Sequence, residues 1–257
     1  MISNEDNKFH FWYVLSFRND FADYAELCFK TFGDRVKHWF TINEPTVSAV
    51  YGYEVGIAPP GRCSLKEEFC VFGAPPPGPC QVSTGKCTPD ANSSTEPYIV
   101  AHNLILAHAS AVKLYREKYQ ALQKGEIGVV LASPYLVPYS DSPKDIAATE
   151  RSYDFNLGWF LEPIVFGEYP RSMKELVKER LPCFSAEEKC LIKGSLDFVA
   201  INYYKSYYVK NKQPTPTEEP RYSVDVAAEQ TSKDLPAHHT FKLNFPLMFL
   251  IFQVLQV

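Results

Sequence analysis

The sequence lacks an excess of charge of either sign and lacks a long uninterrupted apolar run. Its 257 residues include 26 Lys and Arg against 30 Asp and Glu, which gives a formal net charge of -4. Without a basic surplus, nucleic acid is not expected as a partner. The most apolar stretch, residues 241–257, is broken by Lys242, Asn244 and Pro246 and is short for a membrane span, so no membrane association is expected.

Signals for targeting and for metal binding are also scarce. Glu5 and Asp6 stand where a signal peptide would carry basic residues, so no such peptide is predicted at the start of the sequence. Four of the seven cysteines crowd into a stretch rich in Pro and Gly, but no His lies among them and their spacings match no common zinc pattern: Cys63, Cys70, Cys80 and Cys87. Disulfide bonds in a long loop are the better interpretation, which implies an oxidising compartment. The triplet Asn92-Ser93-Ser94 just beyond is a glycosylation sequon, with Asn92 as the acceptor.

What is present is an alternation of helices and strands. Helices are expected over 20–32, 98–119, 143–157 and 171–179. Short runs rich in β-branched and aromatic residues predict strands over 35–42, 127–131 and 196–203, while 52–95 is expected to be mostly loop. This order favours a parallel sheet with helices outside, either a (β/α)8 barrel or a doubly wound sheet. No glycine-rich phosphate-binding motif follows any strand, which speaks against a nucleotide-binding doubly wound sheet.

The first predicted helix, residues 20–32, carries an apolar stripe that is expected to face the core. Cys28 lies on this stripe and is therefore expected to be a buried free thiol. The stripe consists of Phe21, Tyr24, Ala25, Cys28, Phe29 and Phe32.

Polar residues gather at the ends of the first and third predicted strands. Asn43 and Glu44 follow the first strand, and Asn202 and Tyr204 follow the apolar part of the third. Because barrel enzymes place reactive side chains at the C-terminal ends of their strands, these four residues are expected to face one pocket. The alternative is that Asn43, Glu44 and Pro45 simply form a turn, since all three residue types favour the ends of elements.

The sequence around these positions resembles glycoside hydrolase family 1, in particular the plant β-glucosidases. Residues 41–45 (TINEP) resemble the family motif T-x-N-E-P, and residues 197–204 (DFVAINYY) resemble the sixth-strand motif D-F-x-G-x-N-Y-Y. Similar blocks lie at 22–39, 52–64, 94–98, 158–164 and 167–170. The resemblance implies the fold class α/β, as a partial (β/α)8 TIM barrel covering about strands 4–6 and their helices.

The resemblance also implies roles and a reaction, the cleavage of β-glucosides with retention of configuration. Glu44 matches the general acid/base, and Asn43 the residue that binds the sugar 2-hydroxyl. Tyr204 matches the tyrosine that holds the nucleophilic carboxylate, with Asn202 beside it. Retaining cleavage needs two carboxyl groups about 5–5.5 Å apart, one as proton donor and one as nucleophile. Relatives need no metal or organic cofactor, and none is expected here.

The second carboxylate of that pair is not recognisable in this sequence. The family carries it in an I/V-T-E-N-G motif at the end of the seventh strand, and residues 205–257 contain no such motif. Glu218, Glu219 and Glu229 stand in polar sequence that is expected to be loop. The chain is therefore expected to be a β-glucosidase by family but inactive by itself. The alternatives are a non-catalytic isoform that binds glycosides or associates with full-length homologues, and a non-functional translation product.

Three segments are expected along the chain: a divergent start over 1–16, the partial barrel over 17–235 and a divergent apolar tail over 236–257. An open piece of barrel would leave two sheet edges unpaired and an apolar face exposed, which predicts marginal stability and aggregation. The family context implies the secretory pathway, vacuole or apoplast. Of the three pairings that the four loop cysteines allow, the resemblance favours Cys63 with Cys87 across the loop, which leaves Cys70 and Cys80 to pair with each other.

Overall fold

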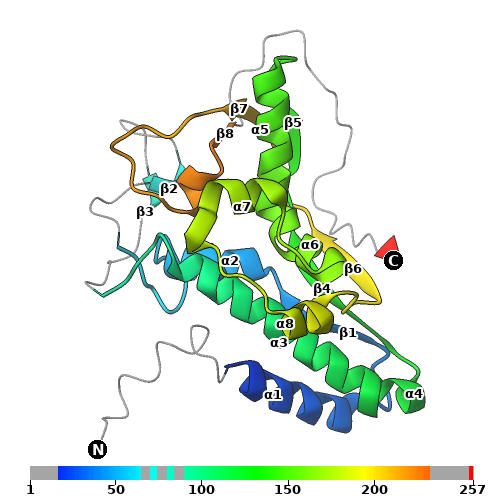
Figure 1. Cartoon of the computed structure of the whole chain (residues 1–257). Helices are drawn as coiled ribbons and strands as arrows, with labels where there is room; N and C mark the ends of the chain where they lie inside the picture. Colours follow the sequence, from blue (N-terminus) through cyan, green and yellow to red (C-terminus); the bar gives the residue numbers. More distant parts are fainter. Residues whose placement is uncertain (1–16, 65–69, 74–79, 84–89, 232–254, 257) are drawn as a thin grey trace, which may run out of the picture.

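The computed structural model describes residues 17–64, 70–73, 80–83, 90–231 and 255–256 (Figure 1). Its central sheet has the strand order β1-β4-β6-β9. The first three strands run parallel to one another, and the short β9 is antiparallel to β6. The bounds are β1 His38–Asn43, β4 Glu126–Ala132, β6 Phe198–Asn202 and β9 Leu255–Gln256. The three strands predicted from the sequence are thus confirmed, and they form the predicted parallel arrangement.

Two smaller sheets accompany the central one. In the first, β5 pairs in parallel with β7, which pairs antiparallel with β8. Since β5 and β7 follow β4 and β6 closely in the chain, this sheet extends beyond the ends of those strands. The second is the antiparallel pair β2-β3. The bounds are β2 Cys70–Gly73, β3 Cys80–Ser83, β5 Tyr135–Pro138, β7 Ser206–Asn211 and β8 Ala228–Thr231.

The helices fall between the strands in the order expected for an α/β chain. The longest is α3, which lies beside α1 in Figure 1 and carries buried residues along most of its length. The bounds are α1 Phe17–Phe32, α2 Pro45–Tyr53, α3 Glu96–Lys118, α4 Gln120–Gln123, α5 Pro143–Tyr153, α6 Trp159–Phe166, α7 Arg171–Val177, α8 Ala186–Ile192 and α9 Tyr222–Asp225. A π-helix, Asp154–Gly158, joins α5 to α6, and a short 3-10 turn, Lys178–Arg180, follows α7.

The main core joins the sheet to α2, α3 and α6. Tyr98 and Leu104 of α3 are buried together with Val129 of β4 and Trp159 of α6. The rings of Tyr98 and Trp159 lie 5.5 Å apart. Burial of such large aromatic side chains contributes roughly 2–3 kcal/mol each relative to their exposure. This core fixes the positions of the strand ends that carry the polar residues.

The predicted apolar stripe of the first helix is only partly correct. Ala25 and Phe29 are buried, with the Phe29 ring 4.7 Å from the ring of Tyr115 on α3. Tyr24 is 62% exposed and Phe32 is 42% exposed. Only one face of the helix packs against α3, and both rings lie beside that face. Cys28 is a free thiol as expected, but it is half-buried rather than buried.

Several elements were not predicted. Helix α2 begins at Pro45, where a first-turn proline is tolerated because its missing N–H has no helical partner. Helix α8 begins at a capping box of Ser185 and Glu188, a signal that is readable in the sequence. Glu229 was assigned to a loop, which is wrong, because it lies in β8.

The prediction of two unpaired sheet edges is wrong at one edge. Val199 of β6 pairs with Leu255, and Phe198 pairs with Gln256. A strand of the expected divergent tail therefore covers the outer side of β6. The sheet described here leaves the outer side of β1 without a strand partner.

Candidate active site

Glu44 stands where the chain turns from β1 into α2. Its amide donates to the carbonyl of Val130 on β4 at 2.9 Å, so the β1–β4 ladder reaches this residue. Its backbone has φ 49° and ψ 55°, the left-handed conformation that non-glycine residues rarely adopt. Such a conformation costs about 1–3 kcal/mol and persists only where the surrounding structure holds it. The ladder on one side and Pro45 on the other hold Glu44 in place.

The carboxylate of Glu44 is held from the end of β6, two strands away. Asn202 donates through Nδ2 to Oε1 of Glu44 at 2.8 Å and to Oδ1 of Asn43 at 3.0 Å. The hydroxyl of Tyr204 donates to the same Oε1. Both donors therefore meet one carboxylate oxygen, and Oε2 accepts no hydrogen bond from the part of the chain that the structure describes. The four residues predicted to meet at the strand ends do so.

Tyr204 is 66% exposed, and its hydrogen bond to the Glu44 carboxylate raises the pKa of its phenol. Its expected contact was with a second carboxylate rather than with Glu44. In this chain its hydroxyl instead adds a donor to Glu44, so its role in holding a nucleophile stays a prediction.

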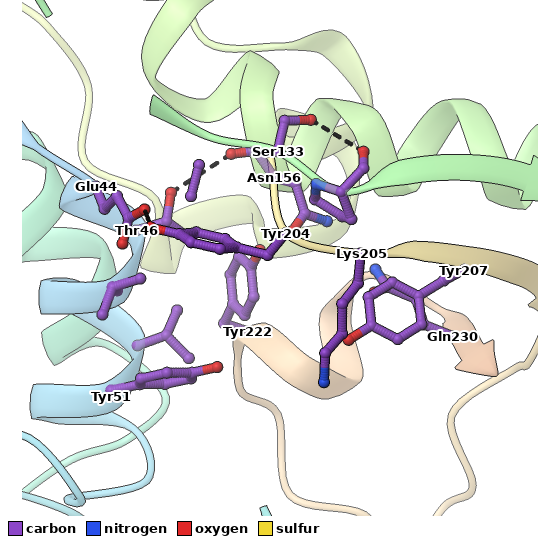
Figure 2. Close-up of a pocket in the computed structure, with 14 residues that line it drawn as sticks. Glu44, Thr46, Tyr51, Ser133, Asn156, Tyr204, Lys205, Tyr207, Tyr222 and Gln230 are labelled. Carbon is purple, nitrogen blue, oxygen red and sulfur yellow. Dashed lines mark hydrogen bonds between the residues drawn. The ribbon is translucent and has the colours of Figure 1, made fainter. Parts of the chain in front are cut away.

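A cavity of about 450 Å³ opens beside Glu44 (Figure 2). A volume of this size suits a small organic ligand. Glu44 and Tyr204 line it, whereas Asn43 and Asn202 do not, so the prediction that all four residues face one pocket is wrong for the two asparagines. Asn202 supports Glu44 directly, and Asn43 contacts Asn202. The lining residues are Glu44, Thr46, Val47, Val50, Tyr51, Ala132, Ser133, Pro134, Asn156, Tyr204, Lys205, Tyr207, Tyr222 and Gln230.

Three further tyrosines form aromatic walls of this cavity, and none was predicted from the sequence. Tyr51 comes from α2, Tyr207 from β7 and Tyr222 from α9. Burial, then the proximity of Tyr207 and Glu44, raises the pKa of Tyr51. Tyr222 stacks on Trp159 at 5.0 Å and donates its hydroxyl to the carbonyl of Phe155 at 3.1 Å. Tyr51 follows Glu44 by two helical turns, a signal that becomes readable only once α2 is known.

The short helix α9 that carries Tyr222 is anchored by two buried carboxylates. Glu54, which is fully buried at the end of α2, accepts from the Ser223 hydroxyl at 2.5 Å and from its amide at 3.1 Å. Burial, opposed by these hydrogen bonds, raises the pKa of Glu54 to about 7. At the other end of α9, Asp225 forms a two-pronged ion pair with Arg180, at 2.7 Å for each contact. These contacts fix the aromatic wall that faces Glu44.

A buried histidine ties the Glu44 strand to its neighbours. His108 of α3 contacts Oγ1 of Thr41 through Nδ1 at 2.6 Å and the carbonyl of Ser195 through Nε2 at 2.6 Å. Because a carbonyl only accepts, Nε2 carries the proton and Nδ1 accepts from Thr41. Burial lowers the pKa of His108 to about 4, so the ring is neutral near pH 7. These two contacts fix Thr41, which precedes Glu44 by three residues, and they were not predicted from the sequence.

The remaining sequence-based assignments lie away from the cavity. Cys63 is disulfide-bonded, but its predicted partner Cys87 lies outside the described residues, so that pairing stays a prediction. Asn92 is exposed, and its Oδ1 accepts from the hydroxyl and the amide of Ser94 at 2.9 and 3.0 Å. Its glycosylation also stays a prediction. Over the ranges that the structure describes, no group of three or more metal-ligating side chains is found, and no helix is both long and apolar enough to cross a membrane.

Comparison with known proteins places this arrangement in a family. The family model for glycosyl hydrolase family 1 matches residues 12–249. β-Glucosidase 1 of Oryza sativa subsp. japonica is 53% identical over 205 residues, and β-glucosidase 44 of Arabidopsis thaliana is 50% identical over 202 residues. These alignments cover 80% and 79% of this chain but 36% of each relative. The chain thus spans about a third of the length of the curated relatives it matches.

Solved structures agree with the predicted fold. The rice Os3BGlu6 β-glucosidase matches with a TM-score of 0.76 and 41% identity, over 85% of this chain and 43% of that chain. A family 1 β-glucosidase from the fungus Humicola insolens, solved in complex with glucose, matches with a TM-score of 0.75 and 36% identity, over 88% of this chain and 43% of that chain. The fold is therefore part of a (β/α)8 barrel, and the doubly wound alternative is excluded. The match of the family model over most of the chain, including the Asn43-Glu44-Pro45 turn, shows that this chain belongs to glycosyl hydrolase family 1.

Proposed function

We propose that this chain carries the proton-donor part of a retaining β-glucosidase site, with Glu44 as the general acid/base. The observation that supports it best is the position of Glu44 at the mouth of the barrel segment, where it lines the cavity and is held by Asn202 and Tyr204. The similar proteins named above are β-glucosidases, and one of them binds glucose. The proposed substrate is therefore a small β-glucoside.

The hydrogen bonds at Glu44 fit a proton donor. Asn202 and Tyr204 both donate to Oε1. Because these hydrogen bonds fix Oε1, they also orient Oε2, the second oxygen of the same carboxyl group. Oε2 can therefore carry the proton that passes to the glycosidic oxygen. As the bond from the anomeric carbon to that oxygen breaks, the leaving group departs as an alcohol. We assign Asn43, which is exposed beside Glu44, to the sugar 2-hydroxyl.

The covalent step needs a second carboxylate about 5–5.5 Å from the first. Among the described residues that line the cavity, Glu44 is the sole carboxylate. We therefore propose that this chain by itself does not turn over β-glucosides, although it retains the acid/base residue and the cavity next to it.

An assay of the purified chain with an aryl β-glucoside tests this proposal. We expect no turnover above the rate of a Glu44→Gln control. Binding of phenyl 1-thio-β-D-glucoside and of its α-anomer, followed by ligand-observed NMR, provides the second readout, and we expect a preference for the β-anomer. Equal binding of both anomers would contradict the assignment as a β-glucoside site. If the wild-type chain turns over the aryl β-glucoside and Glu44→Gln abolishes that turnover, the proposal that the chain is inactive by itself would be contradicted.

A second proposed function is non-catalytic association with full-length homologues. In the described part of the central sheet, β1 has no strand partner on its outer side, and such an edge can accept another strand. Co-elution of the chain with a full-length plant β-glucosidase in size-exclusion chromatography tests this function. Separate elution at all mixing ratios would count against it.

A further inference from the structure

Lys205 lines the cavity beside Glu44 and has no carboxylate partner among the residues described. It follows Tyr204 in the turn between β6 and β7, and its side chain is exposed. Other lysines of this segment do have partners: Lys210 lies over the ring of Tyr139 at 5.4 Å, and Lys212 is 3.7 Å from Glu218. Figure 2 shows Lys205 among the lining side chains, with Tyr222 on one side of it and Tyr207 on the other. The cavity wall thus carries an ammonium group that forms no ion pair with a carboxylate of the described residues.

The cavity lies on the leaving-group side of the proton donor. On the proposed function, the sugar contacts Asn43 at the strand ends, and Asn43 is not part of the cavity wall. The wall is built mainly from α2, the end of β4 with the turn that follows it, the turn after β6, the start of β7 and α9. Since the acid protonates the oxygen between sugar and leaving group, the group beyond that oxygen occupies this cavity.

The other lining residues define the chemistry of that group. Tyr51, Tyr207 and Tyr222 present aromatic rings, and the aliphatic side chains of Val47 and Val50 add apolar surface. Flat apolar walls favour an aromatic ring. An ammonium group without a carboxylate partner favours an anion on that ring, and the pair gains charge-assisted hydrogen bonds.

We propose that the cavity selects β-glucosides whose aromatic leaving group carries a carboxylate, and that Lys205 determines this preference by pairing with it. The inference rests on the proposed function, because it places the leaving group next to Glu44. Lys205 is partly solvated, so the preference is expected to be modest, about threefold to fivefold over a neutral analogue. It should shrink as salt is raised.

Binding of two matched, non-hydrolysable ligands tests the proposal without requiring turnover. The ligands are 4-carboxyphenyl 1-thio-β-D-glucoside and 4-(hydroxymethyl)phenyl 1-thio-β-D-glucoside, titrated at pH 7 into the full chain. We expect the carboxylate to bind more tightly. Lys205→Met should remove the difference, and Lys205→Arg should retain it. Lys210→Met, on an exposed lysine that does not line the cavity, is the matched control and should change neither affinity.

The outcomes separate the two levels of the proposal. Equal affinity of the wild-type chain for both ligands, or a preference that survives Lys205→Met, would overturn the inference and leave the β-glucosidase assignment intact. Failure of both ligands to bind, together with no discrimination between the α- and β-anomers of the phenyl thioglucoside, would overturn the proposed function itself.

Discussion

The amide nitrogen of Asn202 lies 2.8 Å from the carboxylate of Glu44 and so joins the end of β6 to the end of β1. The two residues are separated by 158 positions in the sequence, and β4 lies between their strands. This hydrogen bond links the two family motifs of the sequence, which the parallel sheet places at the same edge. It also orients the oxygen of Glu44 that is proposed to carry the proton.

Replacing Asn202 should cost stability as well as geometry. Asn202→Ala removes the hydrogen bonds to Glu44 and Asn43, and bonds to a charged acceptor contribute about 1.5–3 kcal/mol. We expect the free energy of unfolding to fall by about 2 kcal/mol, measured by urea titration. Gln213→Ala, at an exposed position, is the control and should stay within about 0.5 kcal/mol of the wild type. An Asn202→Ala variant as stable as this control would show that the bond contributes little.

His108 should make the fold less stable in mild acid. Its pKa is lowered by burial to about 4 in the folded chain, below the ordinary 6.5, so the unfolded chain binds the proton more readily. The contribution of His108 to the unfolding free energy should therefore rise with pH between about 4 and 6.5, by roughly 3 kcal/mol over the whole window. His108→Gln should remove this contribution, so the unfolding free energy of the wild type minus that of the variant should rise over this window in urea titrations at several pH values. An unchanged slope in the variant would mean that His108 is not the group responsible.

Glu54 should act in the opposite direction. Burial raises its pKa to about 7 in the folded chain, above the ordinary 4.5, so the folded chain holds the proton more tightly than the unfolded one. Its contribution to stability is present below about pH 4.5 and is lost as pH rises through 7. Between about 4.5 and 6.5 the two slopes should largely cancel in the wild type. His108→Gln should then expose a loss of stability with rising pH, and Glu54→Gln a gain. If both variants follow the wild-type pH profile, neither group is the source.

Gly128 should not tolerate a side chain. It pairs with Phe198 across the β4–β6 ladder, and a Cβ atom at this position would lie 2.2 Å from the backbone oxygen of Phe198. Because a backbone atom in a central sheet cannot move away cheaply, Gly128→Ala should lower the unfolding free energy by about 3 kcal/mol or prevent folding. Gly194→Ala is a useful comparison, since no atom lies within 4 Å of its Cβ and its cost comes from a φ of +74° alone. A smaller loss at position 128 than at 194 would contradict the close approach of the two strands.

Local patterns in the sequence were enough for the order of the elements and for part of the site. The strands β4 and β6 are readable as apolar runs, and α3 is readable from its helical periodicity. Both patterns depend on backbone geometry, which residues close together in the sequence determine. Asn43, Glu44, Asn202 and Tyr204 stand at strand ends, so a parallel sheet was sufficient reason to bring them together.

Tertiary structure decided what a local pattern does not encode. Tyr51, Tyr222 and Lys205 meet at one cavity because α2, α9 and the turn after β6 pack together across long separations in the chain. Tyr24 is a second example of what the sequence does not determine. The helical pattern allowed a wide apolar stripe that included Tyr24, but only contact with α3 decides which of these residues are buried. Local backbone preferences act over a few residues, whereas the cavity and its charge arise from contacts that form only when distant segments are buried against each other.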